Sequence, residues 1–212
     1  SVDYSTLQSR TLARLNMSTN DPAAANVDEY VNEALHYLET ASPDGWPWMR
    51  ATINTTISAA SYTFTQLSAS QTVAKVLSVK VLANNTYYPL GLRSQDELDQ
   101  LYPIPSSTGT PESFNVEGQS LYVYPTPETS YTARLRVIVT EPDLGGNTST
   151  PVIPVVFHSA VVEAALLLMY ETLQDETRRA TQEKKVGMWV DRMRRYGMPY
   201  ESSPKIRVRE WL

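Results

Sequence analysis

The spacing of apolar residues changes twice along this chain, and the two changes limit the folds that it can adopt. Val27, Val31 and Leu35 recur at the spacing of one helix face, whereas apolar residues alternate after Met49 as they do in a strand. Helical spacing returns after Pro154. We therefore predict an α+β fold, in which a helical bundle carries an inserted antiparallel β domain.

About four helices are expected in the bundle. The first is predicted to open at a capping box formed by Ser5 and Gln8, and the last to be capped by Asp175. The third is apolar nearly all round, which is typical of a helix buried on several sides, so we place it at the centre. The predicted helices span residues 5–16, 24–41, 155–173 and 175–196.

Short runs of alternating residues predict the strands of the inserted domain. Ala51, Ile53 and Ile57 share one face of the first strand, and a hairpin is expected to lead from it to a strand with Tyr62 and Phe64. Further strands are predicted at 76–82, 87–90, 120–124 and 132–140. A capping box at Ser94 and Glu97 predicts a short helix between the second and third of these strands. Residues 103–111 are predicted to form a loop.

These patterns divide the chain into three parts. Residues 1–45 and 150–197 are predicted to form the helical bundle, and residues 46–149 the β domain. Residues 198–212 are predicted to form an extended C-terminal tail, because Pro199 and Pro204 interrupt the helical pattern. In that tail, Lys205, Ile206, Arg207, Val208, Arg209 and Trp211 alternate charge with bulk in the period of a strand.

Composition excludes several kinds of protein. The chain has no cysteine, which rules out disulfides, thiolate metal sites and a thiol nucleophile. No apolar run is expected to approach the about 18 residues of a membrane span, and no secretory signal pattern opens the chain. We therefore expect a soluble protein with no membrane contact.

Charge is distributed unevenly. Residues 1–175 carry 8 Lys and Arg against 18 Asp and Glu, whereas residues 176–212 carry 10 against 5. A basic end on an acidic body often marks an interaction segment, although a solvated helix with a frayed end would have the same composition. The 13 Tyr and 4 Trp against 3 Phe suit half-wet subunit interfaces as well as ordinary sheets.

No arrangement of catalytic residues emerges. His36 and His158 lie on separate predicted helices without triad order or metal-ligand spacing, and Gly145-Gly146 is too isolated to hold phosphates. Asp96, Glu97 and Asp99 are better explained by the first turn of a helix than by a metal site. We therefore expect no enzyme activity, no cofactor and no metal.

The order of the elements carries a family resemblance. Two helices precede Gly45-Trp46-Pro47-Trp48 at the start of a strand, and Tyr122-Val123-Tyr124-Pro125 leads to a turn before Tyr131. Pro151-Val152-Ile153-Pro154 then opens the long apolar helix. This arrangement, over residues 5–196, resembles the phage head-to-tail adaptor family, called head-completion or connector proteins in long-tailed phages and tail tubular protein A in short-tailed ones.

The resemblance implies a structural virion protein at the head-to-tail junction, made in the host bacterial cytoplasm. It implies a ring of about twelve copies beneath the portal protein, which continues the DNA channel without specific DNA binding and seats the next tail or nozzle protein. It also implies that the C-terminal segment docks on the portal, and the six tail residues named above are the expected contacts. Another phage structural protein, such as a tail terminator or a minor capsid or tail protein, is the alternative, and a small phage enzyme is less consistent with the sequence.

Overall fold

The computed structural model describes residues 3–18, 24–104 and 107–197, and these divide into two compact units. One unit contains the four longer α-helices and comprises the described residues up to Trp46, those of Gly146–Thr150 and those from Pro154 onward. The other contains the strands with two short α-helices and comprises Pro47–Gly145 with Pro151–Ile153. The chain is therefore α+β, as predicted, and its described residues include six α-helices.

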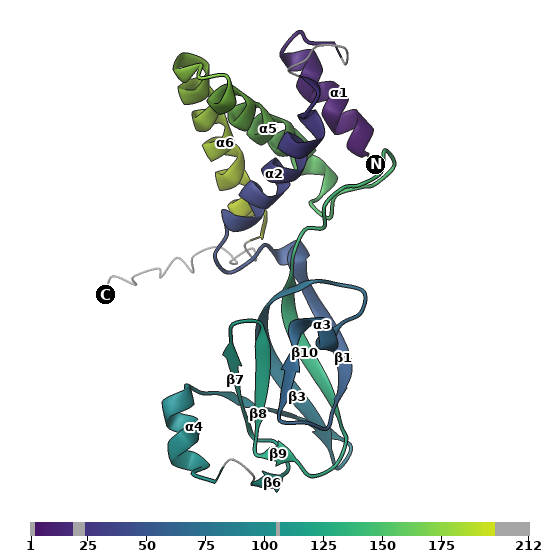
Figure 1. The fold of residues 1–212 in the computed structure, drawn as a ribbon, viewed down its shortest axis with the longest axis vertical. Coiled ribbons are helices and arrows are strands. Elements are labelled where there is room, and N and C mark those ends of the chain that lie inside the picture. Colours follow the sequence, from purple (N-terminus) through teal and green to yellow (C-terminus); the bar gives the residue numbers. More distant parts are fainter. Residues whose placement is uncertain (1–2, 19–23, 105–106, 198–212) are drawn as a thin grey trace, which may run out of the picture. The chain divides into compact units, whose positions relative to one another are not determined.

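The helical unit is built around one helix. α5 (His158–Thr172) contacts α1 (Tyr4–Arg14), α2 (Val27–Thr40) and α6 (Glu176–Gly197), and Figure 1 shows it running between α1 and α6. Its sequence explains this place, because ten of its 15 residues are buried and they cover every side of the helix. The short 3-10 helix Val155–Phe157 leads into it.

The stretch Val155–Thr172 corrects an expectation about membranes. Among the described residues it is the one helical stretch long and apolar enough to cross a bilayer, so the expectation that no run approaches that length was wrong. In the structure, 61 % of this stretch is buried inside the protein. The core helix of a soluble protein has the same length and composition, and packing by three other helices accounts for the apolar residues here.

The N-terminal cap of α6 is the predicted residue, whereas the N-terminal cap of α1 is a different one. The side chain of Asp175 accepts a hydrogen bond from the backbone N–H of Arg178 at the start of α6, as predicted (3.0 Å). The cap of α1 is Asp3, not Ser5, and its carboxylate accepts from the Thr6 N–H (2.9 Å). Ser5 donates its hydroxyl to the same carboxylate (3.0 Å), so the acidic side chain has displaced the predicted capping box.

Trp46 packs back onto the end of α2. Its side chain is buried, and the indole Nε1–H donates to the backbone carbonyl of Leu38 (2.7 Å). This bond satisfies a carbonyl in the last turn of α2, where the helix itself provides few donors. Trp48, two residues later, is only partly buried.

The first sheet of the other unit has the order β1-β10-β3-β4 and is antiparallel throughout. Ile53 of β1 lies opposite Leu135 of β10, and Leu135 lies opposite Val79 of β3, so apolar residues share one face. The strands are β1 (Arg50–Ile57), β3 (Val73–Ala83), β4 (Thr86–Pro89) and β10 (Tyr131–Val139).

The second sheet has the order β2-β8-β7-β5 and is antiparallel except for the parallel pair of β5 and β7. Its strands are β2 (Ser61–Thr63), β5 (Gly91–Leu92), β7 (Ser113–Glu117) and β8 (Ser120–Tyr124). A small parallel pair, β6 (Thr108–Gly109) with β9 (Thr126–Pro127), lies apart from both. α4 (Gln95–Leu101) opens at the predicted capping box of Ser94 and Glu97.

Three local predictions about the strands were wrong. β1 and β2 do not form a hairpin, because β1 pairs with β10 and β2 pairs with β8 in the other sheet. Phe64 begins the short helix α3 (Phe64–Leu67), capped by Thr63 and Gln66, instead of continuing a strand. β7 was not predicted, and β6 lies within the predicted loop 103–111. Short strands of this kind depend on distant partners for their formation.

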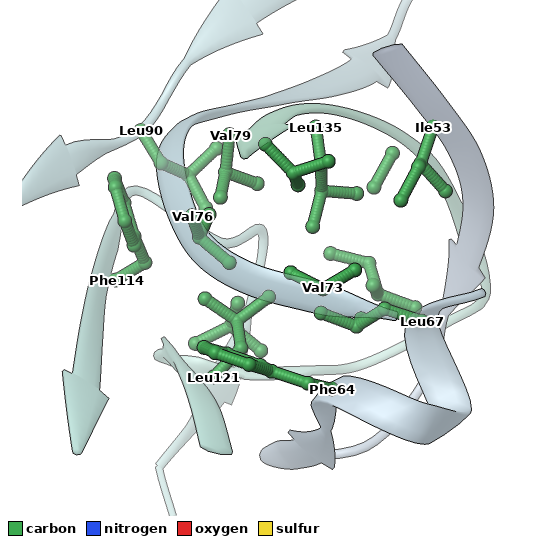
Figure 2. Packing of buried hydrophobic residues seen from close by; sticks show 14 of the residues in the cluster. Ile53, Phe64, Leu67, Val73, Val76, Val79, Leu90, Phe114, Leu121 and Leu135 are labelled. Atoms are coloured by element: carbon green, nitrogen blue, oxygen red, sulfur yellow. The ribbon is translucent and has the colours of Figure 1, made fainter. Parts of the chain in front are cut away.

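The core of the β unit lies between the two sheets (Figure 2). Leu135 and Val79 project from the first sheet, Phe114 and Leu121 from the second, and all four are at most 2 % exposed. Figure 2 shows Phe64 of α3 packed beside Leu121 in the same cluster. Because apolar residues alternate along the long strands, each sheet buries one face and leaves the other to solvent.

Candidate interaction surfaces

The residues predicted to dock on a partner fall outside the part of the chain that the structure describes. Lys205, Ile206, Arg207, Val208, Arg209 and Trp211 all lie beyond residue 197. The last described element is α6, which leads toward them along the chain.

The histidines do not form a catalytic arrangement. His36 is exposed on α2, with its Nδ1 3.4 Å from Oε2 of Glu39, whereas His158 is buried as the first residue of α5. Within residues 3–18, 24–104 and 107–197, no group of three or more His, Asp or Glu side chains could hold a metal ion. The histidines are thus placed as helix residues, one at the surface and one in the core.

The acidic cluster on α4 serves the helix itself. The backbone N–H and the hydroxyl of Ser94 both donate to Glu97 and hold the pKa of that carboxyl below its usual value. Asp99 accepts a hydrogen bond from the Gln95 side chain (2.7 Å), and Asp96 lies in the first turn, where the helix dipole favours acids. These contacts support the interpretation of the cluster as a helix start.

A buried polar cluster joins three helices of the helical unit, and the sequence analysis did not find it. The carboxylate of Glu163 on α5, 7 % exposed, accepts hydrogen bonds from Arg14 on α1 and from Gln182 on α6. Gln182 also donates to the backbone carbonyl of Glu163 (2.9 Å). The available signal was an acid, Glu163, within the apolar run of residues 160–169, since a buried carboxylate requires partners.

The contacts of this cluster hold helices together. Arg14 is about half exposed and lies with Arg10, Ala13, Ser159 and Val162 along an open hollow between α1 and α5. Every described partner of the Glu163 carboxylate is a donor from another helix, so the carboxylate is occupied within the fold. It ties α1 and α6 to the central helix.

The outer side of α6 forms a surface that we call the α6 basic face, made of Lys184, Met188, Arg192 and Arg195. These residues follow one another at helical spacing on the side opposite the buried Val186, and all four are exposed. α6 carries seven Lys and Arg against three Asp and Glu. The guanidinium of Arg192 lies over the ring of Trp189, 4.9 Å from its centre, which fixes one charge beside an aromatic side chain.

The outer side of α2 has the opposite charge, and we call Asp28, Glu29 and Glu33 the α2 acidic face. All three are exposed, and their carboxylates form no ion pair with any residue that the structure describes. Tyr37, 42 % exposed, lies one turn further along the helix. α2 carries no Lys or Arg. The helical unit therefore presents two exposed helix faces of opposite charge.

One comparison with known proteins, against family models, gives a match. A family model described as SU10 adaptor protein matches residues 2–199, which is nearly the whole chain. A search of the curated proteins found no match.

Proposed function

Because this chain belongs to the SU10 adaptor protein family, a family of phage head-to-tail adaptors, we propose that it assembles as a ring beneath the portal. Family membership makes it a structural component of the virion at the head-to-tail junction, where its partners are portal and tail proteins. The proposal adds that about twelve copies form the ring, that the ring continues the DNA channel, and that it seats the next tail component.

The single observation that carries this proposal is the family match over residues 2–199, with the helical unit built around α5. A ring needs a rigid protomer with surfaces for its neighbours. The helical unit has a buried central helix, a polar cluster that ties three helices together, and charged outer faces. These are suitable properties for such a protomer.

The charge of the body supports a conduit in which DNA slides. Residues 1–175 carry ten more acidic than basic side chains. A wall rich in Lys and Arg would hold phosphates through counterion release, whereas an acidic wall does not. The proposal therefore assigns DNA passage to the ring without sequence-specific binding.

The C-terminal segment is proposed to dock on the portal. Its Lys205, Arg207 and Arg209 would steer it to an acidic surface, while Ile206, Val208 and Trp211 would fill pockets there. One copy should bind weakly, and a ring of copies should bind tightly, because each bound neighbour raises the effective concentration of the next.

The test mixes the purified portal of the same phage with the intact protein and counts ring occupancy by electron microscopy. A variant with Ile206→Asp, Val208→Asp and Trp211→Ala should lose most of its occupancy. Its control, Ser202→Asp with Ser203→Asp, adds the same charge to the same segment and should bind as the intact protein does. Absence of any ring with the intact protein would disprove the ring, and full occupancy by the triple variant would disprove the docking role of the tail.

A further inference from the structure

The α6 basic face has the composition of a protein contact. Lys184 and Arg192 form no ion pair with any described residue, so their charges are available to a partner. Met188 lies between them on the helix and is 59 % exposed, and the guanidinium of Arg192 lies over the ring of Trp189. Asp191, on the same side of the helix, is paired with Arg194 (3.7 Å). A flexible apolar side chain with Lys and Arg one turn away on either side, beside a Trp, is typical of an interface centre with a charged rim.

The α2 acidic face complements it in charge. Glu29 and Glu33 are one helical turn apart on α2, whereas Lys184 and Arg192 on α6 are two turns apart with Met188 between them. Tyr37 offers an exposed ring beyond the two glutamates, and Met188 offers an exposed thioether side chain beyond Lys184. Two helices with this pattern can pair their charges while an apolar contact forms between them.

One protomer presents both faces at once. α2 and α6 both pack on α5, and each charged face lies on the side of its helix away from the buried residues. An interface between two different surfaces of identical copies is heterologous, and such an interface closes into a ring when the rotation between copies allows it. The partner that fits the basic face is therefore a second copy of this chain.

We infer that the α6 basic face of each copy packs against the α2 acidic face of its neighbour in the ring. This inference rests on the proposed function, because it names the surfaces that would join the protomers. Duplex DNA is the other polyanion that a basic helix could bind, and the experiment below separates the two.

The experiment reverses each face in turn and counts portal-bound rings by electron microscopy. One variant carries Lys184→Glu and Arg192→Glu, and the other carries Glu29→Lys and Glu33→Lys. Each variant alone should lose ring occupancy at least about tenfold, because like charges then meet at every interface. An equimolar mixture should restore rings, since copies of the two variants can alternate with opposite charges facing each other.

A matched control keeps the charge change but moves it to the β unit. Lys75→Glu with Lys80→Glu reverses two exposed lysines on β3 and should leave ring occupancy unchanged. A chain with no cysteine also allows a direct check, in which Glu33→Cys and Lys184→Cys together should give a ladder of cross-linked oligomers on the portal. Neither single cysteine should give more than dimers.

The outcomes separate the inference from the function on which it rests. Rings of the intact protein, together with full occupancy by both reversed variants, would overturn the pairing of the faces and leave the ring intact. Retention of duplex DNA by the intact protein on filters, lost in the Lys184→Glu and Arg192→Glu variant while rings persist, would assign the basic face to nucleic acid instead. Failure of the mixture to restore rings that each variant has lost would also overturn the pairing.

Discussion

Gln182 on α6 donates its side-chain amide to the backbone carbonyl of Glu163 on α5, with Nε2 and O 2.9 Å apart. The same amide also reaches the Glu163 carboxylate, which accepts from Arg14 on α1 as well. Both Gln182 and Glu163 are buried. The central helix is therefore joined to two others by polar contacts within its apolar surroundings.

Replacing Gln182 with Leu should destabilise the protein by about 1–3 kcal/mol, because the buried Glu163 carboxylate would lose a donor that water cannot replace. Chemical denaturation measures the free energy of unfolding. Gln100→Leu, the same change at an exposed position on α4, is the control and should cost less. Equal losses for the two variants would mean that the Gln182 hydrogen bonds do not stabilise the helical unit.

The pKa of Asp3 should lie below its ordinary value of 3.8 because the Thr6 hydroxyl, first, and the Thr6 backbone N–H donate to the carboxylate. A lowered folded pKa means that the ionised form stabilises the fold. That contribution is complete above the unfolded pKa and is lost as the pH falls through the folded pKa. NMR titration of the Asp3 carboxyl measures the shift directly.

Thr6→Val removes the hydroxyl and keeps the backbone N–H, so the titration midpoint of Asp3 should move toward 3.8. Thr177→Val, at an exposed position on α6, is the control and should leave the midpoint where it is. An unchanged midpoint in Thr6→Val would contradict the assignment of the shift to the hydroxyl.

Leu135→Ala should cost about 2–5 kcal/mol of stability, since the side chain is fully buried between the two sheets and its loss leaves a cavity. Leu77→Ala on β3 makes the same change where 36 % of the side chain is exposed, and it should cost clearly less. Thermal and chemical unfolding of both variants give the comparison. A larger loss for Leu77→Ala would mean that the core lies elsewhere.

Trp46→Phe keeps an aromatic ring but removes the Nε1–H that donates to the Leu38 carbonyl, so stability should fall by about 1–2 kcal/mol. Trp48→Phe is the matched control at a partly buried position and should cost less. The melting temperatures of the two variants measure the two losses of stability. A greater loss of stability for Trp48→Phe would contradict the role given to Trp46.

Deleting residues 199–212 should leave a protein that folds cooperatively, because Pro199 and Pro204 break the helical pattern and no apolar residues at helical spacing follow them. Circular dichroism should show unchanged helix content. The truncated protein should nevertheless fail to occupy the portal. Aggregation or loss of helix after truncation would mean that the segment belongs to the fold and would weaken its proposed docking role.

Most helices could be predicted because their signals are local. The capping box of Ser94 and Glu97 and the cap at Asp175 are formed by residues three positions apart, and both are present in the structure. The predicted box of Ser5 and Gln8 failed because Asp3, a stronger acceptor two residues earlier, binds both the Thr6 N–H and the Ser5 hydroxyl. Competition between neighbouring acceptors is decided by geometry and not by residue type alone.

The sequence predicts part of the two charged faces. The acidic side of α2 and the basic character of the chain after residue 175 follow from helical spacing and composition. α5 covers one side of α6, and the packing of the two helices therefore decides which positions of α6 stay exposed. The exposed positions include Lys184, Met188 and Arg192, which share one outer face. The Glu163 cluster was missed because its donors lie 149 and 19 positions away.

The fold class, the existence of the long helices and the alternation of the long strands could all be predicted from the amino-acid sequence, since each depends on the spacing of residues a few positions apart. The pairing of β1 with β10 and not with β2 depends instead on tertiary contacts. A strand exposes backbone donors and acceptors on both edges, and its partner is selected by the burial of side chains from distant segments. Ile53 pairs with Leu135, 82 positions further along the chain, because together they fill the same core.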